Sequence, residues 1–291
     1  MKPSKAHILA LSEALLVTFL WSTSYILVKM GLREINPLAF VTYRYVVASL
    51  VLALPMLGRF RSFLANLSLK RVSVFLLLGF SGYFVAQGLQ ILGLYYLQAV
   101  AVTFILNLTP IFVLVLGVFF LKEKPSPVQI IGIVLTLCGV LVFFANSVMV
   151  LGEVFGVVAT FVSGFGWAIY MVVTRYWLRE NVEIIPLTAC SMALGAVMLL
   201  VITGLTGNVV QISVDGWALV LWLGIVNTAL AFVLWNHSLK SLRAYEQSVI
   251  QNTMLIQIAL LACVFLNEFL TLYKVLGIVL VFVGVLIVQL F

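Results

Sequence analysis

The second half of this chain repeats the first, and this repeat limits the possible folds more than any other feature. Shifting the sequence by 145 or 146 positions brings Gly132 onto Gly277, Gly139 onto Gly284, Asn107 onto Asn252 and Trp21 onto Trp167. The matching stretches run through most of both halves. We therefore divide the chain into two repeats, residues 1–148 and residues 149–291.

The composition places the chain in a membrane. Hydrophobic residues make up 64% of the sequence and charged residues 9%, whereas soluble domains are roughly half apolar and a quarter charged. A bilayer core requires about 20 apolar residues per helix. Ten apolar segments are predicted to be helices, at approximately 8–30, 38–57, 72–95, 99–121, 128–144, 152–177, 184–205, 216–239, 244–265 and 273–291. The fold class is therefore an all-α membrane protein.

Five helices per repeat is an odd number, so the second repeat enters the membrane from the side opposite to the first. The charges agree with this inverted topology, because cations concentrate on the side that holds both termini. With the N-terminus in the cytoplasm, the inside cations are Lys2, Lys5, Arg59, Arg61, Lys70, Arg71, Lys122, Lys124, Arg175, Arg179, Lys240 and Arg243. We expect an inner (plasma) membrane protein with both termini cytoplasmic. The net charge of +7 is spread over short loops and does not indicate nucleic-acid binding.

No catalytic, cofactor or metal motif is present. Cys138, Cys190 and Cys263 lie inside predicted helices, and His7 and His237 are far apart in sequence. The sequence lacks a phosphate-binding loop, a metal-spaced His or Glu pair and a nucleophile elbow. A secondary transporter or facilitator is therefore the leading interpretation. An intramembrane enzyme, a lipid-handling scaffold and an ion channel are the alternatives.

Several motifs resemble one known family. Trp21 to Lys29, Asn36-Pro37 and Arg44 are similar to the first two helices of EamA-type members of the drug/metabolite transporter superfamily. The segments Asn107-Leu-Thr-Pro110 and Leu121-Lys-Glu123 are similar to the fourth and fifth helices. The resemblance covers essentially the whole chain and implies an inner-membrane transporter of small metabolites. Two positions depart from the family pattern: Ser22 replaces the usual glycine, and Leu255 replaces the proline that would match Pro110.

Polar side chains inside the segments predict a substrate cavity. Such groups are costly in hydrocarbon and tend to face a bundle interior or a wet cavity. In duplicated membrane proteins the site commonly lies where the repeats meet. The predicted substrate-binding residues are Trp21, Tyr25, Gln87, Gln90, Thr103, Asn107, Trp167, Tyr170, Asn227, Trp235, Gln247, Gln251 and Asn252. The alternative role for each amide is an interhelical hydrogen bond that only holds helices together.

Three buried charges and one proline have open roles. Glu13 is the candidate for proton coupling, Lys29 can reach the surface, and Arg44 can bind a substrate carboxylate or serve a structural role. Pro110 lacks an N–H and predicts a hinge or a bend in the fourth helix. An amino acid fits a site of amides and aromatic rings, possible export included, as do other amphiphilic metabolites or drugs. A phosphorylated sugar fits less well.

Overall fold

The fold is helical throughout the part of the chain that the structure describes. The computed structural model describes residues 5–59, 67–121, 126–145, 150–179, 182–242 and 244–290, and no strand occurs within these ranges. Eight helical spans are long and apolar enough to cross a membrane: His7–Gly31, Pro37–Gly58, Leu69–Tyr96, Ala99–Leu116, Pro127–Phe144, Leu151–Leu178, Ile184–Leu205 and Val214–Ser241. The all-α membrane class is thereby confirmed.

The last two predicted segments also form helices. The ninth segment is α13 (Ala244–Phe265), with an apolar stretch over Thr253–Phe265 among the described residues. The tenth is α14 (Leu272–Leu290), with an apolar part over Leu272–Ile287.

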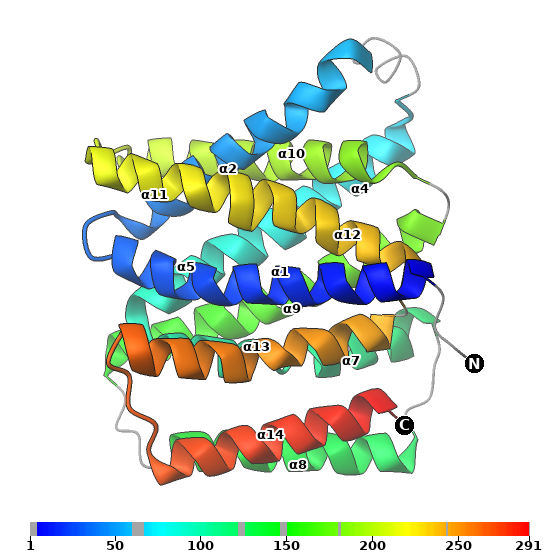
Figure 1. The fold of residues 1–291 in the computed structure, drawn as a ribbon, viewed down its shortest axis with the longest axis vertical. Coiled ribbons are helices and arrows are strands. Elements are labelled where there is room, and N and C mark those ends of the chain that lie inside the picture. Colours follow the sequence, from blue (N-terminus) through cyan, green and yellow to red (C-terminus); the bar gives the residue numbers. More distant parts are fainter. Residues whose placement is uncertain are drawn as a thin grey trace.

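Most helix axes run side by side across Figure 1. The first half contains α1 (Lys5–Gly31), α2 (Pro37–Ala53), η1 (Leu54–Arg59), α4 (Leu69–Leu78), η2 (Gly79–Gln87), α5 (Gly88–Tyr96), α6 (Ala99–Leu106), α7 (Thr109–Leu121) and α8 (Pro127–Phe144). The second half adds α9 (Leu151–Arg179), α10 (Ile184–Leu205), α11 (Val214–Gly224), η3 (Ile225–Leu230) and α12 (Ala231–Ser241), followed by α13 and α14. The described helix α1 begins, and α14 ends, at the same end of the bundle (Figure 1). We call this the termini end.

The predicted fourth helix is broken into α6 and α7 just before Pro110. Proline cannot donate to the carbonyl four residues back, at Leu106. The Thr109 hydroxyl donates to that carbonyl instead, at 2.6 Å. The Asn107 amide donates to the Thr103 carbonyl at 2.8 Å. The Thr103 carbonyl also accepts from the Asn107 backbone N–H, so the carbonyl that Pro110 leaves without an N–H partner is that of Leu106, and Thr109 satisfies it.

Two stretches widen from α-helix to π-helix, at η2 and η3. Each continues an α-helix without interruption: α4 ends at Leu78, and α11 ends at Gly224. In the sequence, Gly79 and Gly224 are 145 positions apart. Short π segments are rare and are frequently found at functional sites. Both widened stretches belong to helices of the central part of the bundle.

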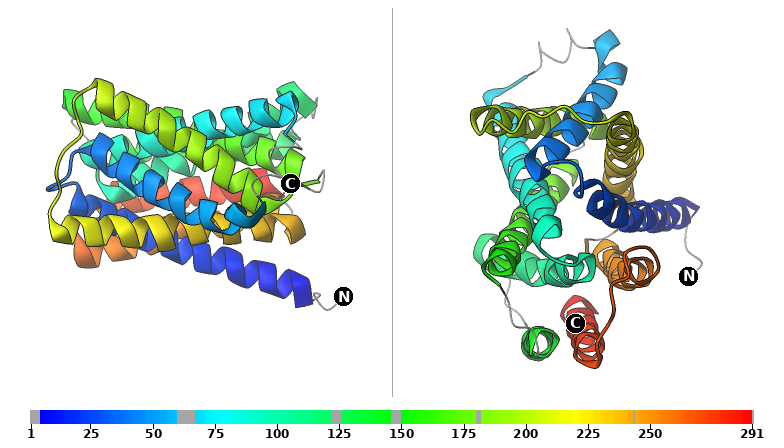
Figure 2. Two further views of the ribbon diagram at one scale, coloured as in Figure 1. Left: turned by 90° about the horizontal axis from the view of Figure 1, so that it is seen from above. Right: turned by 90° about the vertical axis from the view of Figure 1, so that its left-hand side faces the viewer.

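The helices α8 and α14 form a pair at one edge of the bundle (Figures 1 and 2). Glycines allow their backbones to touch. A Cβ on Gly139 would lie 2.8 Å from the backbone nitrogen of Val281 and 3.0 Å from the Gly277 carbonyl. A Cβ on Gly284 would lie 2.7 Å from the Gly132 carbonyl. Small residues at such contacts are the common means of packing helices in membranes, where lipid is as apolar as a side chain.

Candidate functional site

A pocket lies among the central helices and contacts neither α8 nor α14. Its open volume is about 790 Å³, a figure that includes space continuous with the outside. The described lining residues come from α1, α2, η2, α5, α6, α7, α9, α12 and α13. They are Trp21, Ser24, Tyr25, Arg44, Gln87, Gln90, Thr103, Leu106, Asn107, Thr109, Pro110, Val113, Trp167, Met171, Phe232, Gln251 and Met254.

Aromatic rings from three helices form one wall of the pocket. Trp21 of α1 meets Trp167 of α9 edge to face, with ring centroids 5.9 Å apart. Phe232 of α12 lies 5.5 Å from Trp21 and 5.8 Å from Trp167. Such contacts fix the rings, and a rigid ring wall can hold an apolar or flat part of a ligand.

Arg44 is the charged residue of the described lining. Its side chain is 5% exposed. The guanidinium Nε donates to Thr228 Oγ1 at 2.7 Å, and Nη2 donates to the Asn227 carbonyl at 3.4 Å. It also lies 5.8 Å from the ring of Tyr45. All of these partners are neutral. A guanidinium has five N–H donors, so capacity remains for a ligand.

The π segment η3 positions this arginine. Its wider turn places Thr228 so that the hydroxyl donates to the Leu223 carbonyl five residues back, at 2.8 Å, while accepting from Arg44. The Asn227 carbonyl is the second acceptor for Arg44. The Asn227 side-chain amide donates to the Leu20 carbonyl and so ties η3 to α1. Backbone geometry that is rare elsewhere thus holds the guanidinium at the pocket.

The described lining also presents several amides. Asn107 uses its N–H for the Thr103 carbonyl, which leaves its side-chain oxygen to accept. The amides of Gln87, Gln90 and Gln251 form no hydrogen bond with another residue in the described part of the chain, and each side chain is partly exposed. The pocket therefore combines polar groups that fix orientation with rings that bury apolar surface, the usual construction of a ligand site.

Comparisons with known proteins identify the family. The model of the EamA-like transporter family matches residues 8–145 and again residues 154–290. This chain belongs to the EamA-like transporter family. It is a membrane transport protein and not an enzyme, and the resemblance found in the sequence motifs is confirmed.

Two individual relatives are similar over at least 90% of their length and a third over 60%. The chain is 28% identical over 274 residues to an "uncharacterized transporter" of Archaeoglobus fulgidus, covering 91% of this chain and 90% of that protein. It is 27% identical to the "uncharacterized transporter YoaV" of Bacillus subtilis, covering 92% of each. Against the "uncharacterized inner membrane transporter YhbE" of Escherichia coli it is 29% identical over 202 residues, 62% of this chain and 60% of that protein. A crystal structure with 19% sequence identity superposes with a TM-score of 0.67 over 99% of this chain and 98% of the other, which shows a common fold.

Many of the residues predicted from the sequence line the pocket of this EamA-like transporter. They are Trp21, Tyr25, Gln87, Gln90, Thr103, Asn107, Trp167 and Gln251, together with Arg44 and Pro110. They come from most of the elements that surround the pocket and from both halves of the sequence. The fold thus brings together side chains that are far apart in the chain.

Tyr170 and Asn227 lie outside the lining. Tyr170 stacks behind Trp167 with ring centroids 5.0 Å apart, and its hydroxyl is 2.9 Å from that of Tyr83. Asn227 is fully buried and donates to the Leu20 carbonyl. Both side chains are used in contacts between helices, the alternative role that the sequence left open for the amides.

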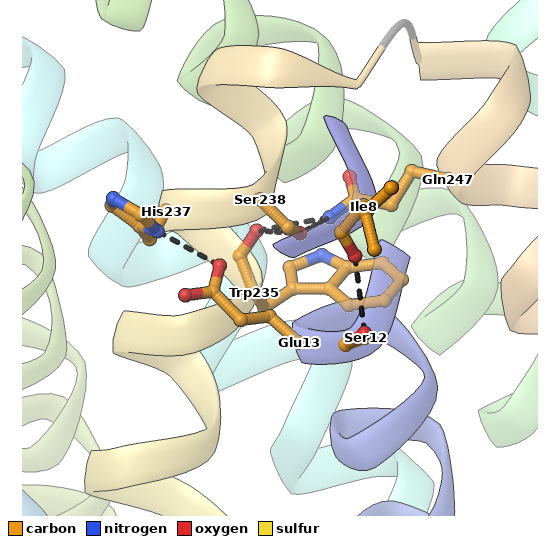
Figure 3. A network of polar contacts seen from close by, with 7 residues as sticks. All are labelled: Ile8, Ser12, Glu13, Trp235, His237, Ser238 and Gln247. Atoms are coloured by element: carbon orange, nitrogen blue, oxygen red, sulfur yellow. Dashed lines mark hydrogen bonds and ion pairs between the residues drawn. The ribbon is translucent and has the colours of Figure 1, made fainter. Parts of the chain in front are cut away.

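Trp235 and Gln247 also lie outside the lining. Trp235 is fully buried behind Trp21, with ring centroids 4.9 Å apart. Gln247 donates to the Trp235 carbonyl at 2.9 Å and to Ser238 Oγ at 2.8 Å, and so joins α13 to α12 (Figure 3). The side chain of Asn252 lies outside the described residues.

Sequence reasoning missed other lining residues. Ser24, Leu106, Thr109, Val113, Met171, Phe232 and Met254 were not predicted as binding residues. Helical spacing could have identified three of these: Ser24 and Met171 lie three and four positions after Trp21 and Trp167, and Met254 lies three after Gln251. Phe232 carries no such signal, because apolar residues occur on every face of its segment.

The two charged residues of α1 that were singled out in the sequence, Glu13 and Lys29, interact with neighbouring helices. Glu13 pairs with Nδ1 of His237 at 2.8 Å, with Glu13 14% and His237 50% exposed (Figure 3). Lys29 donates to the carbonyls of Leu94 and Leu97, both at 2.6 Å, where α5 ends. Neither Glu13 nor Lys29 lines the pocket. A role for Glu13 in proton coupling stays a prediction.

A carboxylate from the second half of the chain caps the N-terminus of α6. Glu268 accepts from the backbone N–H of Ala99 at 2.8 Å and of Val100 at 3.2 Å. Asn267 adopts a positive φ of 55° in the turn that carries it. A negative charge at a helix N-terminus is stabilising. The corresponding glutamate of the first half, Glu123, lies outside the described residues.

No metal site is evident where side chains are described. No group of three or more His, Cys, Asp or Glu residues among them could hold a metal ion. Cys138, Cys190 and Cys263 are free thiols. The polar and aromatic groups of the described pocket lining are one guanidinium, amides, hydroxyls and aromatic rings.

Proposed function

We propose that this protein is a secondary transporter or facilitator that moves a small amphiphilic metabolite bearing a carboxylate, such as an amino acid or a related acid, across an inner membrane. One observation carries the proposal: a pocket lined from both halves of an EamA-like transporter combines Arg44, free amides and an aromatic wall. Arginine recognises carboxylates through paired charge-assisted hydrogen bonds. Export is one possible direction of this transport.

We further propose that the chain consists of ten transmembrane helices in two inverted repeats, residues 1–148 and 149–291. The α8–α14 contact supports this arrangement. Gly139 contacts Gly277 while Gly284 contacts Gly132, and each pairing exchanges the repeat-equivalent positions of the other. Contacts related in this way are expected when a two-fold axis relates the two halves. The start of a π segment at or beside equivalent glycines in each half, Gly79 and Gly224, adds independent support.

In this proposal, alternating access arises from the two halves exchanging conformations around a fixed pocket. Both termini would be cytoplasmic. Support comes from the cations that the sequence places on the side of the two termini. It also comes from the start of α1 and the end of α14, which lie at the same end of the bundle (Figure 1). The name of the Escherichia coli relative as an inner membrane transporter agrees with this location.

Solute flux tests the proposal. Proteoliposomes that contain only this protein are loaded with a mixture of metabolites, and the loss of each solute is followed by mass spectrometry against protein-free vesicles. Selective loss of carboxylate-bearing amphiphiles is the expected result. Retention of every solute, or loss of all of them without selectivity, would contradict the proposal.

Variants in the pocket sharpen this test. Asn107→Leu and Gln251→Leu remove amides that line the pocket and should reduce flux by about tenfold, which corresponds to ~1.4 kcal/mol. Gln211→Leu is the matched control, because Gln211 is exposed in the loop between α10 and α11. Normal flux in both pocket variants, at equal folded yield, would show that these amides serve only in packing.

A further inference from the structure

The described lining of the pocket carries a net positive charge. Among the described lining residues, Arg44 carries a formal charge and no aspartate or glutamate is present. Its partners are a hydroxyl, a carbonyl and an aromatic ring. The ion pair between Glu13 and His237 does not line the pocket. Among the described residues, the guanidinium is thus buried without a counter-charge.

The remaining charges along α1 do not change this balance. Lys29 is one helical turn beyond Tyr25, and its ammonium group is held by backbone carbonyls where α5 ends. The carboxylate of Glu268 is occupied by the N-terminus of α6. Glu13 is eight residues before Trp21, about 12 Å along the helix axis. The pocket therefore lies in a net positive environment in the described structure.

A buried charge favours a ligand that neutralises it. Desolvation penalises an unpaired ion strongly, and an opposite charge at hydrogen-bonding distance offsets that penalty. A carboxylate alone would leave the pocket neutral. A zwitterion would neutralise Arg44 but bring a buried ammonium group that meets only neutral acceptors, such as amide oxygens and rings. An amine would add a second positive charge.

We propose that the pocket binds an anionic organic acid, with its carboxylate on Arg44 and an apolar or aromatic body against Trp21, Trp167 and Phe232, in preference to the zwitterionic amino acid of the same shape. The inference rests on the proposed transport function and names its substrate class. It distinguishes this site from one that requires the ammonium group of an amino acid.

Three probes of one shape and different charge test the inference. 3-Phenylpropanoate, phenylalanine and phenethylamine share a phenylethyl skeleton and carry net charges of −1, 0 and +1. A second set of 4-methylpentanoate, leucine and isoamylamine repeats the series with an aliphatic body. Binding to the purified full chain in nanodiscs is measured by thermal shift and by titration of tryptophan fluorescence.

The acid should bind at least about tenfold more tightly than the amino acid in one set or both, and the amine should bind most weakly. In Arg44→Gln the advantage of the acid should disappear, whereas in Arg44→Lys, which keeps the charge, the order should persist with weaker binding. Arg33→Gln removes an exposed arginine at the turn after α1 and should leave the order unchanged. If Arg44→Gln does not fold, Arg44→Lys and the order in the unaltered protein decide the matter.

Two outcomes would overturn the inference. One is an amino acid that binds as tightly as the acid of its set, and the other is the failure of both sets to bind. Neither outcome touches the proposed transport function, which is tested by solute loss from vesicles. Selective transport of an amino acid in that assay would support the proposed transport function and contradict only the preference for an anion.

Discussion

The fourth and ninth predicted helices occupy equivalent places in the two repeats of the sequence, yet one is broken and the other is continuous. The first is divided into α6 and α7 at Asn107 and Leu108, whereas α13 runs unbroken from Ala244 to Phe265. Pro110 accounts for the break, and its counterpart Leu255 is a fully buried side chain in α13. One residue therefore decides whether a pocket-lining helix has a bend, and the two halves are unequal around the site.

The largest expected effect comes from placing the same proline in α13. Leu255→Pro would remove a helical hydrogen bond and bring the ring against the preceding turn, at a cost of about 3 kcal/mol or more in the free energy of unfolding. No threonine precedes Leu255 in the way that Thr109 precedes Pro110. Thermal unfolding in detergent would measure the loss. Leu255→Met is the control, with an expected cost below about 1.5 kcal/mol, and equal stability of the two variants would contradict the comparison.

A smaller effect is expected where the end of α13 meets the start of α6. Glu268→Gln would keep the shape of the side chain but remove the charge and one acceptor from the N-terminus of α6, at a cost of about 1–2 kcal/mol. Glu34→Gln, at an exposed glutamate just after α1, should change stability little. The same unfolding measurement compares them. If the two variants unfold alike, the carboxylate does not hold α6.

A still smaller effect should result from Thr109→Val, which removes the hydroxyl that satisfies the Leu106 carbonyl at the break. Leaving that carbonyl without a partner should cost about 1 kcal/mol. The control is Thr206→Val, because the exposed Thr206 hydroxyl makes a similar bond to the Ile202 carbonyl at a site where water can replace it. If Thr206→Val lowers the free energy of unfolding as much as Thr109→Val does, the Thr109 hydroxyl has no special role at the break.

The smallest effect on stability, with a clear effect on transport, is expected from Pro110→Leu. The Leu106 carbonyl at the break already accepts from the Thr109 hydroxyl. The free energy of unfolding should therefore change by less than about 1 kcal/mol. If the bend in the fourth helix serves opening and closing, the rate of flux should fall about tenfold, or ~1.4 kcal/mol in the barrier. Flux in vesicles and thermal unfolding together decide the point. Unaltered flux would make Pro110 a bend and not a hinge.

The sequence predicted the helical class and the family because both depend on features that can be recognised in the sequence alone. Long apolar segments need no partner to be recognised, and the motifs around Trp21 and Asn107 are local. The break before Pro110 was also foreseeable, since proline acts within one turn. The hydrogen bonds that Thr109 and Asn107 make at the break are given only by the structure.

The pocket was harder to predict because nearly every face of these helices is apolar. Polar periodicity then cannot tell a face toward the pocket from one toward a neighbouring helix. In the eighth segment the π turn η3 adds a difficulty, because one extra residue in a turn rotates the rest of the helix by about 100°. Trp235, predicted to face the pocket, is fully buried behind Trp21, whereas Phe232 lines the pocket.

The glycine contact between α8 and α14 also sets an order of events during synthesis. The two helices are separated in the chain by the residues between Phe144 and Leu272. At typical ribosomal speeds, on the order of ten seconds pass between the insertion of the first and the arrival of the second. Throughout that time Gly139 lacks the backbone of Gly277 and Val281 against which it packs in the finished fold. A chain that ends before Leu272 would never supply α14. We therefore expect truncation to disturb α8 first, although α8 lies far from the truncated end in sequence.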